Sequence, residues 1–270
     1  MAPRIQSPSS INYFKMCPRC YYYRYIRKVQ LPTTIHLIRG NIVHSALEDF
    51  FKLNINGTHQ DHHEIELNII LQSIFKEKWE EKKEELDEIG LNDKQQEFYF
   101  KESVNMINNW FNRFMSRVLN LSEKIGFREA FNTIKPETEV YFKSEEHMVQ
   151  GYIDAIENID NEISLIDYKT SRKDEMTEEY KLQLAIYALL YKEKYRTEPK
   201  VVGIDFLRHN KRFLEVNEEL INLAKKECKN IQEKTQTEDI EDYISTNHPF
   251  CDCKKYEEII ERTTLDKFTN

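Results

Sequence analysis

The stretch Gly151-Tyr-Ile-Asp154-Ala-Ile-Glu-Asn-Ile-Asp160-Asn161-Glu-Ile-Ser-Leu-Ile-Asp167-Tyr-Lys169-Thr170 predicts two β-strands joined by a tight turn. Asp160-Asn161 favours a two-residue turn, because both residue types tolerate a left-handed backbone. If the strands pair about this turn, Asp154 and Asp167 become cross-strand neighbours. Side chains alternate between the two faces of a strand, so Asp167 and Lys169 share one face.

Two carboxylates beside an ammonium group are costly in a protein interior unless a cation binds there. Mg²⁺ and Mn²⁺ prefer oxygen ligands, which two aspartates and a nearby backbone carbonyl would supply. Such an ion polarises a phosphoryl oxygen, and a neighbouring lysine can orient or help to deprotonate water. The alternative is an exposed Asp/Lys pair without function, worth about 0 to 1 kcal/mol. Asp-x-Lys is a short and common string, so its spacing alone favours neither interpretation.

Further motifs extend over nearly the whole chain. In order, they are SPSSINYFKMCP at 7–18, RGNIVH at 39–44, Glu139, the G-x-x-D and D-Y-K-T of the hairpin, QLAIYA at 183–188, and Cys251, Cys253 and Tyr256. In this order they resemble the PD-(D/E)xK nuclease superfamily. The similarity is greatest to its RecB-like branch, which includes the AddB/RecB nuclease domains and the iron–sulfur nucleases of CRISPR adaptation.

The resemblance implies an α/β fold with a restriction-endonuclease-like core, in which helices flank a mixed central sheet of about four to six strands. It also implies that the metal ligands are His44, Asp154, Asp167 and the backbone carbonyl of Tyr168. A lone histidine beside an apolar helix stripe is more often a partly buried polar residue, but the motif favours the ligand role for His44.

The same resemblance assigns Lys169 as the catalytic lysine, acting with Asp154 and Asp167. Gln183 and Tyr187 match the family's Q-x-x-x-Y motif and are expected near the site and the DNA backbone. They are four residues apart, so a helix would place them on one face.

The five cysteines are an odd number, and the chain shows no export signal, which argues against a disulfide framework. Many RecB-like nucleases hold a [4Fe–4S] cluster with one N-terminal and three C-terminal cysteines, and Cys17, Cys251 and Cys253 match three of these positions. The expected fourth position is vacant, since Ile259 and Ile260 lie there. Cys20 could replace it and complete an iron–sulfur or zinc site. The alternative is that these are ordinary thiols; Cys228, on a predicted helix, is expected in the core.

The net charge of −8 conceals an uneven distribution. Residues 1–47 contain no acidic residue and carry a formal charge of +7, which leaves −15 for the remainder. Tyrosines and phenylalanines lie among these bases, a mixture suited to holding phosphates while bases stack on rings, as in single-stranded DNA binding. Most of these rings could instead be core residues. The candidate DNA-binding residues are Arg19, Tyr22, Arg24, Arg27 and Lys28.

Length and composition predict a soluble globular protein in the cytoplasm. A chain of 270 residues that is 40% hydrophobic can bury a sizeable core. No apolar run approaches the roughly 18 residues of a membrane span, and the N-terminus lacks the apolar core of a secretory signal.

The resemblance implies a single nuclease domain over 1–270, with a helical insertion at about 55–132 and a cysteine region at 248–256. Helices are expected at 9–27, 40–53 and through 63–122, followed by strands at 138–143, 148–159 and 162–169. Beyond these we expect a helix at 177–196 and a second hairpin from Val201–Leu207 and Arg212–Val216. Helices at 217–234 and 238–245 would close the chain.

Together these features predict a metal-dependent deoxyribonuclease that uses Mg²⁺ or Mn²⁺ and acts on single strands or free ends, as an exonuclease or single-strand nuclease in DNA repair or processing. The alternative is a noncatalytic or partner-dependent DNA-binding subunit of a repair or CRISPR-adaptation complex, with a helicase among the possible partners. A third hypothesis is a structural metal protein in which only the cysteines matter. Basic charge alone does not distinguish DNA from RNA.

Overall fold

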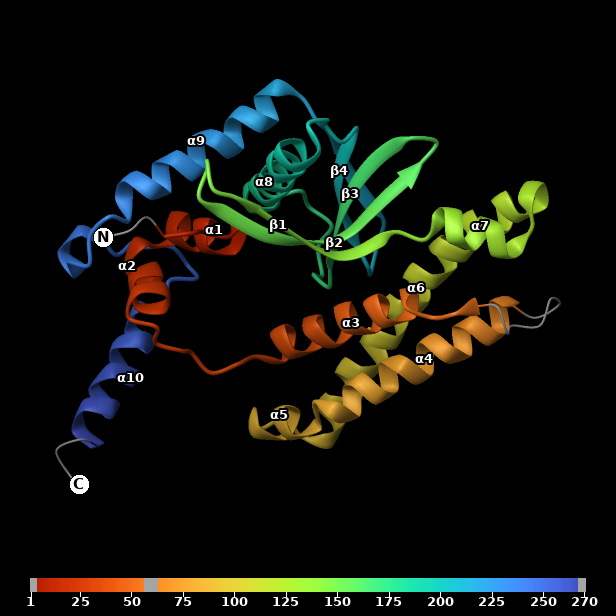
Figure 1. The fold of residues 1–270 in the computed structure, drawn as a ribbon. Coiled ribbons are helices and arrows are strands. Elements are labelled where there is room, and N and C mark those ends of the chain that lie inside the picture. The colour runs from red at the N-terminus through yellow and green to blue at the C-terminus, as the bar shows by residue number, and fades with distance from the viewer. Residues whose placement is uncertain (1–3, 56–62, 267–270) are drawn as a thin grey trace.

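A mixed five-stranded sheet forms the centre of the computed structural model, which describes residues 4–55 and 63–266. Its strands lie in sequence order: β1 (Glu137–Ser144), β2 (Val149–Ile159), β3 (Glu162–Lys169), β4 (Val201–Phe206) and β5 (Lys211–Glu215). Neighbouring strands are antiparallel except β3 and β4, which are parallel and are joined through a helix. The predicted α/β fold with a mixed sheet flanked by helices is confirmed (Figure 1).

The predicted β2–β3 hairpin is confirmed, and its turn has the expected backbone. Asp160 and Asn161 have φ values of 53° and 64°, the left-handed pair that a two-residue turn of type I′ requires. The ladder runs from Ile159 opposite Glu162 to Ala155 opposite Ile166. The second predicted hairpin, β4–β5, is also present.

One face of the sheet is covered by α8 (Glu178–Tyr195), which contacts β1 to β4. Thr177 caps its N-terminus by accepting a hydrogen bond from the Tyr180 amide. Two further helices, α9 (Glu218–Lys234) and α1 (Pro8–Met16), pack against α8 on the side away from the sheet centre (Figure 1). Cys228 is buried in this core, as predicted.

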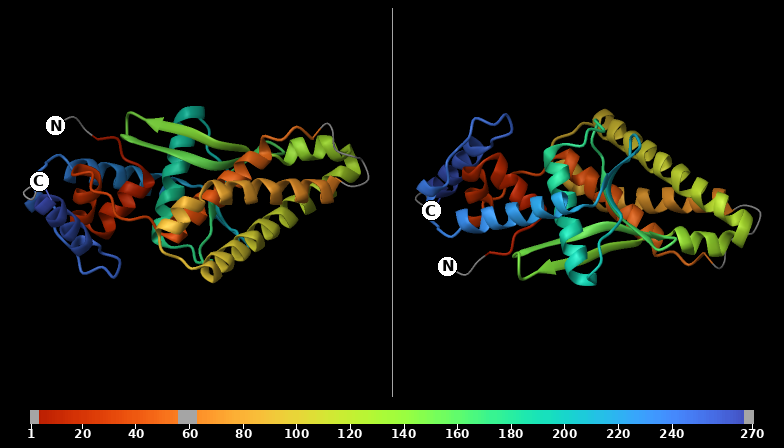
Figure 2. Two further views of the ribbon diagram at one scale, coloured as in Figure 1. Left: turned by 90° about the horizontal axis from the view of Figure 1, so that it is seen from below. Right: turned by 90° about the horizontal axis from the view of Figure 1, so that it is seen from above.

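The other face carries a second core built by α3 (Ile35–Phe51), α4 (His63–Glu81), α5 (Lys83–Glu88), α6 (Asp93–Ile125) and α7 (Phe127–Ile134). Phe50 is fully buried among the rings of Trp110, Phe111, Phe114 and Phe131. Helices α3, α4 and the long α6 lie against one another in this layer (Figure 2).

The helical content expected for 63–122 is therefore present in several pieces. The assignment of 55–132 as an insertion within one domain over 1–270 stays a prediction, and its residues 56–62 lie outside the described part of the chain. Within residues 4–55 and 63–266, no helix combines the length and the apolar character needed to span a bilayer.

The prediction of one continuous helix at 9–27 is wrong. Helix α1 ends at Met16, Cys17 is extended (φ −158°, ψ 108°), and α2 (Pro18–Tyr21) then leads into one π-helical turn at Tyr22–Ile26. Pro18 is the reason, because it disfavours helical geometry in the residue before it and lacks an amide hydrogen. The break places Cys17 directly before α2 and Cys20 within its single turn.

The C-terminal prediction also needs correction. Only Ile240–Asp242 of the expected helix at 238–245 forms, as one 3₁₀ turn, because the Asp239 side chain accepts from the Glu241 amide and caps a short turn. A helix that was not predicted, α10 (Cys253–Asp266), follows instead. Its Tyr256 side chain is fully buried, so packing against the N-terminal segment fixes this helix.

Candidate active site

Three acidic residues lie in one row across strands β1, β2 and β3. Thr138 pairs with Ala155 and Val140 with Ile153, so Glu139 faces Asp154 between these pairs. The β2–β3 ladder ends at Ala155 and Ile166, and one step further Asp154 lies opposite Asp167. The register therefore brings together the two aspartates that the hairpin predicts.

The backbone is irregular at this row. Glu139 has φ of 51°, a left-handed conformation that a non-glycine residue adopts at some energetic cost. In β2, Ile153 and Ile156 contribute to the same core although they are three residues apart, so the alternation of the strand is interrupted between them. Irregular strands of this kind redirect side chains, and here they turn acidic groups toward one another.

Asp154 is the central acid of the row. Its Oδ2 accepts a hydrogen bond of 2.7 Å from the Tyr168 amide, just where the β2–β3 ladder stops. The same oxygen lies 3.4 Å from Nδ1 of His44, which belongs to α3. Burial, and then the nearby Asp167 carboxylate, raise the pKa of Asp154 well above its usual value. A divalent cation would remove this penalty by favouring the charged form.

His44, Glu139 and Asp154 offer ligand atoms that all lie within 4.8 Å of one another. They line an open pocket of about 440 Å³ together with residues of α3. Burial lowers the pKa of His44, which favours the neutral imidazole that can ligate a metal. Burial and the charge of Asp154 raise the pKa of Glu139 to about 7. One nitrogen and carboxylate oxygens form a donor set that fits Mg²⁺ or Mn²⁺.

Asp167 and Lys169 form the second half of the site. The Lys169 ammonium lies 2.5 Å from Oδ2 of Asp167, so the two side chains share a face as predicted. Asp167 is buried, whereas about a quarter of the Lys169 side chain remains exposed. Although burial alone would lower it, the pKa of Lys169 is raised by Asp167 and Asp154. The lysine is therefore a cation that solvent can reach.

Helix α8 supplies two groups that hold Asp167. Gln183 Nε2 donates to Asp167 Oδ1 at 2.7 Å and to the Tyr187 hydroxyl at 2.8 Å. The Tyr187 hydroxyl also donates to Asp167 Oδ1, at 3.4 Å. The two residues lie on one helix face beside the acids, as the Q-x-x-x-Y spacing predicts. The role of the Tyr168 carbonyl as a metal ligand stays a prediction.

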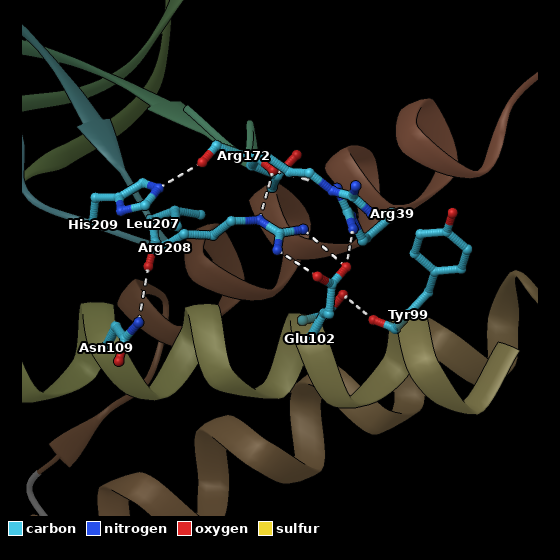
Figure 3. Close-up of polar contacts among 10 residues, drawn as sticks. Arg39, Tyr99, Glu102, Asn109, Arg172, Leu207, Arg208 and His209 are labelled. Carbon is cyan, nitrogen blue, oxygen red and sulfur yellow. Dashed lines mark hydrogen bonds and ion pairs between the residues drawn. The ribbon is translucent and has the colours of Figure 1, made fainter. Parts of the chain in front are cut away.

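A network that the sequence did not reveal supports the end of β3 from the opposite side (Figure 3). Glu102 of α6 accepts hydrogen bonds from Arg39 at 2.9 Å and from Arg208 at 2.5 and 2.9 Å. Both arginines also donate to the carbonyl of Thr170, the residue after Lys169, at 3.3 Å. The helical layer thus fixes the backbone beside the catalytic candidates.

Glu139 was likewise not assigned to the site from the sequence, although its resemblance to the family's early glutamate is visible there. Arg39 lies in the same six-residue motif as His44, which was an available signal. No local pattern connects Glu102 with Arg208, because 106 residues separate them.

The five candidate DNA-binding residues differ in accessibility. Arg24, Arg27 and Lys28 are exposed, and Arg24 lies over the ring of Tyr13 at 5.2 Å. Arg19 is partly buried and donates to the Tyr243 carbonyl at 2.6 Å. Tyr22 is only 5% exposed and packs on Tyr243, so its ring is not accessible for stacking on a base. The expectation for Tyr22 is therefore corrected, because its place in the core outweighs its basic neighbourhood in the sequence.

The four candidate cluster cysteines converge. Sγ atoms of Cys17, Cys20, Cys251 and Cys253 lie within 4.8 Å of one another, and none forms a disulfide. Cys20 therefore lies with the other three cysteines, and its role as a replacement ligand stays a prediction. All four are buried except Cys251, which is partly exposed.

The sheet, the acid row and the adjacent lysine define a nuclease-like class of protein. The sequence matches the PD-(D/E)XK nuclease superfamily over residues 6–260, and the chain belongs to this superfamily. Its nuclease class is thereby shown, while membership of the RecB-like branch stays a prediction.

A solved structure of a proposed exonuclease from Eubacterium rectale is similar, with a TM-score of 0.54 and 11% sequence identity. The similarity covers 94% of this chain and 88% of that chain. At this identity it shows the fold alone. None of the curated proteins matches the sequence.

Proposed function

We propose that this protein is a metal-dependent deoxyribonuclease that hydrolyses phosphodiester bonds. The observation that carries the proposal is the row of Glu139, Asp154 and Asp167, with Lys169 beside Asp167. His44 joins Glu139 and Asp154 at an open pocket. The alternative, a surface ion pair without function, does not account for three converging acids. Nor does it account for the raised pKa values of Glu139 and Asp154. Buried titratable groups of this kind are typical of functional sites.

The proposed ligands are His44, Glu139, Asp154 and Asp167, with the Tyr168 carbonyl as a further oxygen. When bound, Mg²⁺ or Mn²⁺ would polarise the phosphoryl group and neutralise developing charge. The Tyr168 amide holds Asp154, and Gln183 holds Asp167, so both carboxylates are oriented before substrate arrives. The Lys169 ammonium can donate to a phosphate oxygen and orient the attacking water.

We further propose that the substrate is single-stranded DNA or DNA with free ends, and that the protein acts on it as an exonuclease. The proposed context is DNA repair or processing, with a helicase or a protein of CRISPR adaptation as partner. Support comes from the exposed cations Arg24, Arg27 and Lys28, which can bind phosphates. The rings around them pack largely in or against the core, so the exposed cations carry this part of the proposal.

The decisive test measures cleavage of labelled single-stranded and duplex DNA in Mn²⁺ and in Mg²⁺. Wild-type protein should cleave, and Lys169→Ala should lose at least about a hundredfold, the lower range for one positioned catalytic group. Lys229→Ala provides the control, because Lys229 is an exposed lysine of α9 with 78% of its side chain accessible. Binding of DNA without cleavage by the wild type in either metal would instead support the noncatalytic subunit.

A further inference from the structure

The sulfur atoms of the four-cysteine cluster lie unusually close together. The Cys17 sulfur lies 3.4 Å from that of Cys251 and 3.6 Å from that of Cys253. The Cys20 sulfur lies 3.6 Å from that of Cys251 and 3.3 Å from that of Cys253. The sulfurs of Cys251 and Cys253 are 3.3 Å apart. The distances between the N-terminal and C-terminal pairs, 3.3 to 3.6 Å, are close to the 3.3 Å within the C-terminal pair. The four sulfurs therefore form one compact group rather than two separated pairs.

These distances discriminate between metal centres. A single tetrahedral ion with metal–sulfur bonds of about 2.3 Å places its four sulfurs about 3.8 Å apart. A [4Fe–4S] cluster binds each thiolate to a different iron, so its four ligand sulfurs surround a whole cube of atoms and lie much further apart. A [2Fe–2S] cluster separates its ligands into two pairs. Neither arrangement fits four sulfurs that all lie within 4.8 Å of one another.

The surroundings of the sulfurs fit a closed structural site. The Cys253 sulfur accepts a hydrogen bond from the Ser245 hydroxyl at 3.5 Å. Backbone amides of Cys20 and Thr246 bond the Cys17 sulfur. Such donors stabilise thiolates bound to a metal. Three of the four cysteines are buried, and the four protein ligands leave no position for substrate.

We propose that Cys17, Cys20, Cys251 and Cys253 bind one Zn²⁺ ion in a tetrahedral Cys₄ site, in place of the iron–sulfur cluster that the resemblance to RecB-like nucleases implies. Zinc takes four thiolates without a geometric demand of its own and has no redox chemistry. The site joins the break between α1 and α2 to the start of α10 (Figure 1). Its role is structural and does not depend on the chemistry of the acid row.

Metal analysis tests the assignment. The protein is produced with both iron and zinc supplied, purified without oxygen, and assayed for zinc, iron and acid-labile sulfide. We expect one equivalent of zinc, a colourless protein and no sulfide. Sulfide with several irons per chain would overturn the proposal in favour of a cluster. One iron without sulfide would overturn the choice of zinc, and protein free of both metals would overturn the site.

Variants locate the ion. Cys20→Ser should lose the zinc, whereas Cys228→Ser, which changes a buried cysteine of α9 outside the group, should retain one equivalent. If Cys20→Ser fails to fold, the wild type still provides a test through replacement of zinc by Co²⁺. We expect one equivalent of Co²⁺ to give the intense visible bands of a tetrahedral thiolate complex. If these intense bands do not appear at any stage of the Co²⁺ titration, the Cys₄ assignment is overturned.

Discussion

Gln183 donates a hydrogen bond of 2.7 Å to Asp167, and this bond links the N-terminal half of α8 to the end of the central strand β3. Asp167 also pairs with Lys169, so one carboxylate is held by an amide and an ammonium at once. The Gln183 amide fixes the position of the Asp167 carboxylate, while the Lys169 ammonium is partly exposed to solvent. The α8 helix is therefore a part of the site and not only a cover for the core.

Replacing this amide should weaken metal binding more than folding. We expect Gln183→Leu to reduce activity or apparent Mn²⁺ affinity about 10- to 100-fold, the usual cost of losing a group that orients a metal ligand. The measurement is the cleavage rate across a Mn²⁺ titration. Gln72→Leu, which removes a hydrogen bond to Asn108 in the helical layer, is the control and should leave the Mn²⁺ dependence unchanged.

The acid dependence of stability should reflect Glu157. Burial would raise the pKa of Glu157, but Lys211 and Arg117 outweigh it and lower the pKa below the usual 4.5. A carboxyl group with a lowered pKa in the fold stabilises it above the unfolded pKa, and this stabilisation is lost as the pH falls through the folded pKa. Glu157 accepts from Arg117 at 2.8 and 3.0 Å and from Lys211 at 2.8 Å.

We therefore expect Glu157→Gln to cost about 1.5 to 3 kcal/mol of unfolding free energy at pH 7, and the difference from wild type to shrink below about pH 4.5. Urea denaturation from pH 7 to pH 3 measures both. Glu162→Gln breaks only an exposed pair with Lys200 and should change stability by less than about 1 kcal/mol. A constant difference at every pH would contradict the assignment.

The network around Glu102 predicts a large loss of stability. Arg39 has only 3% of its side chain exposed and Arg208 has 17%, so Glu102→Ala would leave two adjacent cations without their carboxylate. We expect a loss of about 3 to 5 kcal/mol in unfolding free energy, measured by urea denaturation. Glu97→Ala, on the same helix but in an exposed pair with Lys101, should cost less than about 1 kcal/mol. Similar values for both variants would show that the network contributes little.

Two glycine substitutions should act in opposite directions. A Cβ at Gly203 would lie 2.7 Å from the ring of Phe213 and 2.8 Å from the backbone oxygen of Arg212, and a backbone oxygen in a paired strand cannot move aside easily. Gly203→Ala should destabilise the protein by about 1 to 3 kcal/mol. At Gly40, inside α3, the nearest atom would be Thr170 Oγ1 at 3.9 Å.

For that reason Gly40→Ala should stabilise the protein by up to about 1 kcal/mol, because alanine favours a helix over glycine. Thermal and urea unfolding of the two variants beside wild type test the pair. Stabilisation by the substitution at Gly203, or a loss at Gly40 as large as that expected for Gly203, would contradict these packing arguments.

The sequence predicts the sheet hairpins well because their signals are local. Asp160-Asn161 carries its turn preference in two adjacent residues, and the register of the aspartates then follows by counting. The break at Cys17 was missed although Pro18 is visible, since the apolar periodicity on both sides suggested one helix. Helix α10 was missed because its packing against the N-terminal segment joins residues more than 230 positions apart.

The residues of the site that belong to short sequence motifs could be predicted. Those that meet only through the tertiary fold could not. Asp154, Asp167, Lys169, Gln183 and Tyr187 lie together as expected. Glu102 and Arg208 meet only because α6 crosses the turn after β4, which no short pattern encodes. Cys20 was predicted to join the other cysteines because a third C-terminal cysteine is absent. That prediction came from the number of cysteines and not from a local structural pattern.

The contacts between Cys17 and Cys251 have a consequence for synthesis on the ribosome. The first helices emerge more than 230 residues before the segment that completes their sulfur group. Until that segment leaves the exit tunnel, Cys17 and Cys20 are a reactive dithiol without partners. A nascent chain stalled before residue 251 should thus remain open to oxidation and to proteases around Cys17, and become resistant once the segment that carries Cys251 and Cys253 has emerged.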